Sequence, residues 1–456
     1  MNDLTPIPKG RTRRVHALSS PAESAKMNDL TGRIHLPLPL LVAAIAAVSM
    51  WCAQATAQEL SAPLRLADVV RIAEQRRAEI VAAVARVSAA AQRPAIAGAL
   101  EDPMIAPSID HYPFNPMEEA GANGRFDWSI AIEQRFPLSD IRTQRRRAAQ
   151  ADARRSEAEV DRVRLDVALE AQRAFFMLRE RREMVRVLDE QLALARQLVA
   201  AAAARYAGGK GGQADVLRAE VEVARAQAAS RSLTADISAA EAMLNVSLGR
   251  SASLPVPPLE YQVRSDEPPA AASVQSAAVE NRPELRAGAA EVARASSEIE
   301  VMRAMYRPMM TIRAGPSSTM AEGAGAMIMI GVSVPIWRER LRSDVAKAVA
   351  MQGMARADLE AMRRMIEGEA VAAREGVNAS RVRLDAVRKE VVPRARMAVE
   401  AALAAYSAGR STLVPVIESS RTLWDVRSEL VMADRALAEA WVRLERAVAN
   451  RGQAAP

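Results

Sequence analysis

The 456-residue sequence offers few side chains of the types and spacings that catalysis or metal binding needs. It has one cysteine and three histidines, so neither a Cys/His zinc site nor a cysteine nucleophile is expected. The segment Gly208–Gly212, GGKGG, is as glycine-rich as a phosphate loop. However, it follows a helical pattern rather than a strand and lacks the GxxxxGK[ST] spacing. We interpret it as a turn between helices, and expect no enzyme activity, no resident metal and no cofactor.

Methionine is the other residue type that could do chemistry. The chain has 21 methionines, and 12 of them lie between positions 302 and 397. Thioethers are soft ligands that suit Cu(I) and similar ions, but methionine also fills irregular contacts between helices. We favour packing for pairs at helical spacing, such as Met351 and Met354. Met327 and Met329 differ, because they alternate with isoleucines in a strand-like segment.

The N-terminal segment predicts export. Residues 36–51, LPLPLLVAAIAAVSMW, form an apolar run of 16 residues, shorter than the roughly 20 that a membrane-spanning helix needs. The run follows Arg33 and precedes Ala55-Thr56-Ala57, which has the small-x-small pattern of a signal-peptidase site. We expect residues 1–57 to be an N-terminal extension and signal peptide, cleaved after Ala57. Met27 begins a repeat of the first four residues and is an alternative start.

Composition favours a mainly helical protein. Only 15 residues are aromatic, and half of the chain is hydrophobic with 26% charged residues. This balance supports a core but disfavours a large soluble β domain. No basic patch is interleaved with aromatic residues, so no nucleic-acid partner is expected.

The exported part contains two copies of one plan. Four local matches recur in the same order at nearly one offset; they pair 77–80 with 282–285, 136–138 with 334–336, 206–210 with 406–410, and 215–217 with 415–417. The sequence therefore predicts a first repeat at 58–253, a Pro-rich linker at 254–272, a second repeat at 273–450 and a tail at 451–456.

Each repeat is expected to contain a helix, two strands, a very long helix and a return helix. In the first repeat the expected ranges are a helix over about 64–97 that stops at Pro94, strands 104–114 and 125–137, a long helix 139–206 and a return helix 213–248. In the second they are a helix 273–306, strands 308–316 and 325–336, a long helix 338–406 and a return helix 411–449. Apolar stripes on two faces of the long helices are typical of coiled coils packed on two sides.

The strands point to a membrane. From position 125 to 136 apolar and polar residues alternate, over the length that a tilted bilayer-spanning strand requires. Asp127, Glu133 and Arg135 share one face, as do Met327 and Met329 in the second repeat. Four strands cannot close a barrel, and an open sheet edge cannot lie in lipid. We therefore expect a homotrimer with a closed 12-stranded β-barrel, four strands per chain, whose lumen these five side chains face.

This organisation resembles the TolC family of outer-membrane efflux proteins. The resemblance covers nearly all of 60–450 and rests on the two turns after Tyr206 and Tyr406 and on the strand-ending Phe136-Pro137 and Val334-Pro335. It implies a trimer in the cell outer membrane whose barrel continues as a long α-helical coiled-coil barrel in the periplasm. It also implies docking to a periplasmic adaptor and an inner-membrane pump of the resistance-nodulation-division type. The segment Val334–Arg338, VPIWR, resembles sequences of the heavy-metal efflux branch of this family.

The resemblance further implies a gate at the periplasmic tip. There, a tyrosine of the second repeat pairs with an aspartate of the first, which correspond to Tyr406 and Asp215. A carboxylate ring position falls on Glu418, and Arg410 lies beside the position of a bridging arginine. The tip turns that would dock the adaptor contain Gly208, Gly209, Gly212 and Gly409.

Two alternative functions remain open at this point. The same duct could export drugs or secreted peptides rather than heavy-metal cations, since the substrate of a wide duct is chosen largely by its pump. The chain could instead be a periplasmic coiled-coil adaptor without a pore. That class should contain a lipoyl-like β domain, which this sequence does not show.

Overall fold

The computed structural model describes residues 60–111, 126–262, 264, 266–319 and 321–450. The expected signal peptide, the end of the strand predicted at 104–114 and the tail at 451–456 lie outside these residues. In the described part of the chain, no helix is both long enough and apolar enough to cross a membrane.

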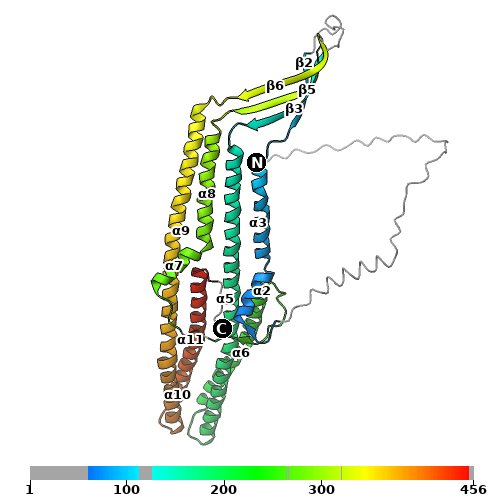
Figure 1. Ribbon diagram of the computed structural model, residues 1–456. Coiled ribbons are helices and arrows are strands. Elements are labelled where there is room, and N and C mark those ends of the chain that lie inside the picture. The colour runs from blue at the N-terminus through cyan, green and yellow to red at the C-terminus, as the bar shows by residue number, and fades with distance from the viewer. Residues whose placement is uncertain (1–59, 112–125, 263, 265, 320, 451–456) are drawn as a thin grey trace, which may run out of the picture. The chain divides into compact units, whose positions relative to one another are not determined.

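Helices dominate the described chain, and two long hairpins of helices carry a small sheet (Figure 1). The first repeat contains β1 (Leu64–Arg65), α2 (Leu66–Arg76), α3 (Ala78–Ala97), β2 (Met104–His111), β3 (Asp127–Pro137), α5 (Ile141–Ala207) and α6 (Gln213–Ser247). The second contains β4 (Leu259–Glu260), α7 (Ala271–Asn281), α8 (Pro283–Ala304), β5 (Met309–Thr319), β6 (Gly323–Ser333), α9 (Arg338–Ala386), a π-helical turn (Val387–Val391), α10 (Val392–Ser407) and α11 (Val414–Ala447).

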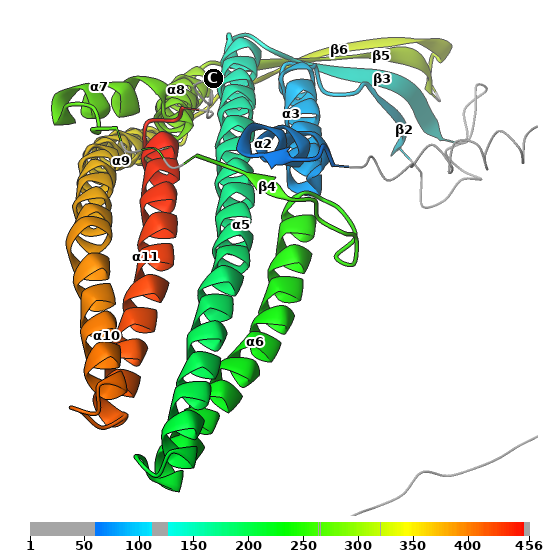
Figure 2. The same cartoon turned by 90° about the horizontal axis from the view of Figure 1, so that it is seen from below.

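Helix α5 runs through the whole helical part and is flanked by different partners in its two halves. In the half nearer the sheet, α3 and α8 lie on either side of it, with α9 beyond α8 (Figures 1 and 2). In the other half, α6 and α11 take these places. Such an element needs apolar residues on more than one face, and both expected stripes of α5 supply buried residues, among them Val167, Ala171, Leu165 and Leu198.

The helices expected at 64–97 and 273–306 are each broken once, which corrects the prediction. Arg77 separates α2 from α3, and Arg282 separates α7 from α8; both have extended backbone, with ψ near 125°. In the second case the cause is readable in the sequence. Pro283 disfavours helical geometry at the residue before it and suits the first position of a new helix.

Arg77 and Arg282, the arginines at the two helix breaks, each connect the break to a neighbouring long helix and to the end of a return helix. Arg77 donates hydrogen bonds to Glu79 (Nη2, 2.8 Å), to Glu170 and to the carbonyl of Val246 at the end of α6. Arg282 repeats the pattern with Glu284 (2.9 Å), Glu369 (3.1 Å) and the carbonyl of Ala447 at the end of α11. A cation at a helix C-terminus satisfies carbonyls that have no partner within the helix and complements its dipole. This recurring junction explains the first of the four repeat matches.

Pro94 does not end the helix that was predicted to stop there, and a second proline, Pro393, lies next to an interruption that was not predicted. Pro94 lies inside α3, which continues for three more residues to Ala97. A proline there removes one backbone hydrogen bond but leaves the donors after it unaffected. The long helix expected at 338–406 is interrupted by the π-helical turn just before Pro393. Proline cannot donate to the preceding turn, and the wider turn accommodates this defect.

The four longer strands form one antiparallel sheet in the order β2-β3-β5-β6. The pairing of β3 with β5 joins the two repeats, for example through Glu133 opposite Arg313. A separate parallel pair joins β1, where the first helix was expected to begin, with β4, in the region expected to be an irregular linker. Strands of two residues have no readable periodicity, so the sequence analysis missed them.

Candidate functional site

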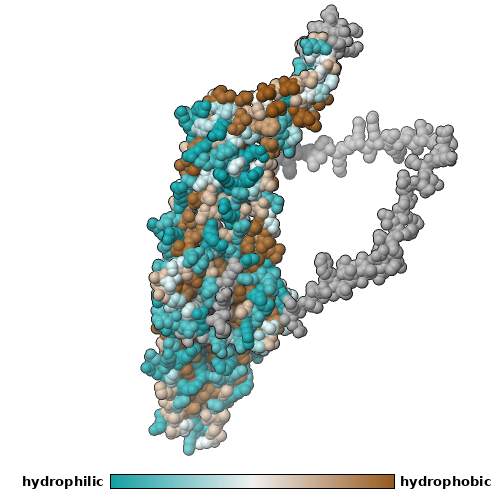
Figure 3. Space-filling model, in the orientation of Figure 1, coloured by the Kyte–Doolittle hydropathy of each residue, from teal (hydrophilic) through white to brown (hydrophobic). Residues whose placement is uncertain are grey.

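One face of the sheet is apolar and exposed. Ile105 and Ile109 of β2, Trp128, Ile130 and Ile132 of β3, and Ile328, Ile330 and Val332 of β6 all lie on it, with 37–76% of each side chain accessible. Figure 3 shows this apolar surface over the strands. Branched and aromatic side chains exposed in alternation along several strands are the pattern of a lipid-facing surface.

The opposite face carries the five side chains predicted to face a lumen. Register and alternation place Asp127, Glu133 and Arg135 of β3 and Met327 and Met329 of β6 on it. Glu133 is largely buried and lies 3.5 Å from Arg135, whereas Met329 is 45% exposed.

The sequence analysis missed a polar residue on the same face. Arg313 of β5 lies opposite Glu133, and its guanidinium donates to Ser108 at 3.3 Å. Ser108 in turn hydrogen-bonds Ser129 at 2.7 Å, with either hydroxyl as donor. The alternation of β5 could have identified Arg313, because it shares parity with Thr311 and Gly315.

At the far end of the helices, two similar turns close the hairpins. Gly209 and Gly409 have positive φ angles of 66° and 74°. In each turn, the amides two and three residues after the helix donate to carbonyls of the last helical turn, as from Gly409 to Tyr406 and from Arg410 to Ala405. Glycine at this position ends a helix without the strain that a side chain would add.

Tyr406 lies just before the second turn and is only 1% exposed, whereas its repeat counterpart Tyr206 is 51% exposed. Burial raises the pKa of Tyr406, the negative charge of Asp215 raises it further, and Arg205 opposes both. The expected Tyr406–Asp215 hydrogen bond is absent: among the described residues, the Tyr406 hydroxyl has no partner. Asp215 instead lies 3.4 Å from Arg218, three residues along its own helix.

Arg205 connects the two turns, and the sequence analysis missed it. Its guanidinium lies 4.6 Å from the centre of the Tyr406 ring and donates to the Tyr406 carbonyl. A second nitrogen donates to the carbonyl of Lys210 at 3.1 Å. A partly buried cation–π contact combined with hydrogen bonds to two turns ties the hairpins of the two repeats together. The repeat position of Arg205 is Ala405, so no repeat match could have revealed it.

The other two residues expected to belong to the gate are at the surface. Glu418 and Arg410 are both exposed. One turn farther along α11, Arg421 forms an ion pair with Glu222 of α6, whose side chain is 5% exposed. This buried carboxylate is a second link between the hairpins.

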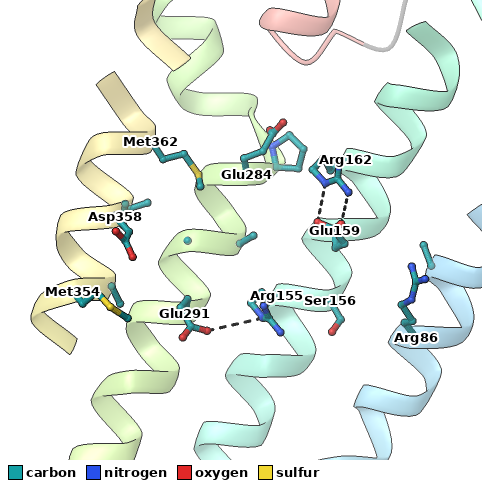
Figure 4. Close-up of a pocket in the computed structure, with 16 residues that line it drawn as sticks. Arg86, Arg155, Ser156, Glu159, Arg162, Glu284, Glu291, Met354, Asp358 and Met362 are labelled. Carbon is teal, nitrogen blue, oxygen red and sulfur yellow. Dashed lines mark hydrogen bonds and ion pairs between the residues drawn. The ribbon is translucent and has the colours of Figure 1, made fainter. Parts of the chain in front are cut away.

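Near the middle of the helical layer, a hollow of about 670 Å³ lies across α3, α5, α8 and α9 (Figure 4). Its charges are largely paired with one another, as in Arg162 with Glu159 and Arg155 with Glu291. Met354 lines it and is 52% exposed, so the expected packing role of the Met351–Met354 pair is not seen in the protomer. Nowhere in the described chain do three or more His, Cys, Asp or Glu side chains gather as metal ligands would.

Comparison with known proteins identifies the family. The sequence profile of the outer membrane efflux proteins matches residues 69–250 and 274–450, one match for each repeat. The chain belongs to the outer membrane efflux protein family. The TolC-type resemblance is thereby confirmed, and with it the expected location in the outer membrane with a periplasmic helical part.

Members of this family with curated functions and solved structures are similar along most of the chain. The cobalt-zinc-cadmium resistance protein CzcC of Cupriavidus metallidurans is 26% identical over 293 residues, which is 64% of this chain and 69% of CzcC. The crystal structure of CusC, at 14% identity, covers 84% of this chain and 91% of CusC with a TM-score of 0.72. VceC of Vibrio cholerae, at 18% identity, covers 84% of this chain and 96% of its own, with a TM-score of 0.71.

Proposed function

We propose that this outer membrane efflux protein works as a homotrimeric export duct. The observation that carries the proposal is the open sheet, in which β2 and β6 are edge strands. Backbone groups along such edges cannot remain unpaired in lipid, and pairing β6 of one chain with β2 of the next closes a ring. Three chains of four strands give a 12-stranded barrel, and the helices continue it into the periplasm.

Cysteine cross-linking tests the trimer directly. The only cysteine, Cys52, precedes the expected cleavage site, so introduced cysteines meet no background. One cysteine scanned along β2 and one along β6 should form intermolecular disulfides that give dimers and trimers on non-reducing gels. Oxidised samples that remain monomeric at every paired position would refute the closed ring.

The proposed cargo is heavy-metal cations, delivered by an inner-membrane pump of the resistance-nodulation-division type through a periplasmic adaptor. Similarity to a cobalt-zinc-cadmium resistance protein supports this substrate class. The inward-facing Asp127 and Glu133 and the tip carboxylate Glu418 are compatible with cations. Loss of the gene should sensitise cells to cobalt, zinc or cadmium salts and leave tolerance of dyes and antibiotics unchanged. The reverse result would favour a duct for drugs.

The tip turns are the proposed docking site of the adaptor and the proposed gate. Gly208, Gly209 and Gly212 in one turn and Gly409 in the other leave these turns with few side chains, of which Lys210 and Arg410 are exposed. Adaptor cross-linking to cysteines in both turns, with none to cysteines in the middle of α5, would support docking there.

Arg205 is the proposed latch of this gate, supported by its contacts with both turns. Arg205→Gln keeps a polar side chain but removes the charge over the Tyr406 ring, and should raise single-channel conductance in planar bilayers. Tyr406→Phe alone should leave conductance unchanged, because the hydroxyl has no partner among the described residues. Asp215→Ala and Glu418→Ala separate the roles of the two carboxylates: the first should change the gate little, and the second should weaken block by multivalent cations. A closed channel in Arg205→Gln would refute the latch.

A further inference from the structure

A pocket of about 530 Å³ lies where the sheet meets the helices. All four passages of the chain between the two parts contribute to it: the segment after α3, the connection from β3 to α5, the connection from α8 to β5, and the connection from β6 to α9. Its size is in the range of small-molecule sites. Of the residues proposed for the gate and the lumen of the duct, only Arg135 lines this pocket.

The pocket wall is strongly cationic. Five arginines line it, at positions 135, 142, 145, 307 and 340, against one acidic residue, Glu101. Glu101 lies 3.8 Å from Arg135, which it can only partly neutralise because both side chains are more than half exposed. The excess of positive charge favours an anionic ligand, and guanidinium groups match phosphate oxygens in geometry.

Two of these arginines are available to a ligand. Arg145 and Arg307 are exposed and form no ion pair within the described residues. Asp140, next to the pocket, accepts a hydrogen bond from Gln144 at 2.7 Å rather than from Arg307. The other arginines are already engaged, for example Arg340 with Asp344 at 3.0 Å.

The rim of the pocket is apolar and exposed. Val334, Ile336 and Trp337 line it with 57%, 67% and 72% of their side chains accessible. Val334 and Ile336 continue the parity of Ile328, Ile330 and Val332, so the apolar face of β6 extends directly into the rim. Figure 3 shows apolar surface reaching from the strands to the tops of the helices. A cationic pocket with an apolar rim suits an amphiphile with an anionic head.

We propose that this junction pocket binds the phosphate headgroup of an anionic glycerophospholipid from the periplasmic leaflet, with its acyl chains along the apolar face of β6. The inference rests on the proposed function, because the sheet must cross the membrane for its junction with the helices to lie at headgroup depth. Aromatic side chains such as Trp337 are favoured at that depth, and basic pockets there bind acidic lipids.

Native mass spectrometry of the delipidated trimer tests the proposal. Phosphatidylglycerol and phosphatidylcholine with the same acyl chains are added in parallel. The trimer should retain up to three phosphatidylglycerol molecules, with a preference over phosphatidylcholine of about thirtyfold for two arginines acting on one headgroup. Arg145→Gln combined with Arg307→Gln should abolish the preference. The control pair Arg356→Gln and Arg396→Gln, which are exposed on α9 and α10 and do not line the pocket, should preserve it.

Equal retention of both lipids by the wild-type trimer, or an unchanged preference in the Arg145/Arg307 variant, would overturn the proposal. Displacement of the lipid by millimolar inorganic phosphate would reassign the pocket to a free anion. If the double variant fails to form trimers, the two single variants are measured instead, each with a partial loss of preference expected. Failure of the wild-type chain to form trimers would count against the proposed function rather than against the pocket.

Discussion

Arg77 and Arg282, the arginines at the two helix breaks, should contribute differently to the stability of the fold although the sequences around them match. Arg77→Ala and Arg282→Ala each remove hydrogen bonds to two carboxylates and to a helix-ending carbonyl. The arginine side chains themselves are similarly buried, at 10% and 6% exposure. The difference in stability between the two variants therefore depends on how well the former partners of each arginine can be hydrated.

The carboxylates that lose their arginine partner destabilise the folded state more in the second repeat than in the first. Glu79 and Glu170, the partners of Arg77, are each 54% exposed and can be hydrated when the arginine is lost. Glu284, a partner of Arg282, is only 15% exposed and would keep only Arg446. Breaking a partly buried pair of this kind costs about 3–5 kcal/mol, whereas exposed charge pairs and a surface carbonyl contribute about 1–2 kcal/mol.

Unfolding of the detergent-solubilised protein, followed by circular dichroism at 222 nm, measures this difference. Arg282→Ala should be less stable than Arg77→Ala by about 2 kcal/mol, the gap between the two estimates. Arg356→Ala, an exposed arginine with no ion pair in the described chain, should unfold like the wild type. Equal losses for the two junction variants would refute the argument from partner burial.

Three further predictions concern backbone geometry and pH. A Cβ on Gly315 would lie 2.0 Å from the carbonyl oxygen of Ile130, so Gly315→Ala should reduce the yield of folded trimer, while Gly325→Ala, with open space around it, should not. Ala449 has a φ of 54°, and Ala449→Gly should raise the free energy of unfolding by about 1 kcal/mol in denaturant titration. Burial alone would raise the pKa of Glu284, but hydrogen bonding to Arg446 and the nearby arginine charges lower this pKa overall. The ionised carboxylate therefore stabilises the folded state above the pKa that Glu284 has in the unfolded chain. This stabilisation is lost as the pH falls through the lower pKa of the folded state. Glu284→Gln should therefore lower the unfolding midpoint at pH 7, with a difference from wild type that shrinks below about pH 4; a constant difference across pH would contradict this.

Long-range periodicity made much of the architecture predictable. The long helices, the glycine turns and the alternating strands each carry a pattern that extends over many residues, and the repeat matches fixed their order. For the same reason the strand faces, including that of Glu133, followed from parity alone.

Features set by single residues were not predictable in this way. The break at Arg77 has no proline after it, and its cause is a set of contacts with Glu170 and Val246 that only the folded chain brings together. Arg205 could not be found for the same reason, since its contacts with the ring and carbonyl of Tyr406 cross to the other repeat. The resemblance located Tyr406 correctly at the tip but paired it with a hydrogen bond that the structure lacks.

The unequal tyrosines at the tip limit the symmetry of the proposed assembly. Two repeats in each of three chains would place six nearly equivalent turns in a ring, with approximate six-fold symmetry. Only one repeat has an arginine at the position of Arg205, and only one tyrosine of each pair is buried beneath it. In the proposed trimer, the ring of turns would therefore have only three-fold symmetry, and an adaptor with six identical subunits would meet two kinds of binding surface in alternation.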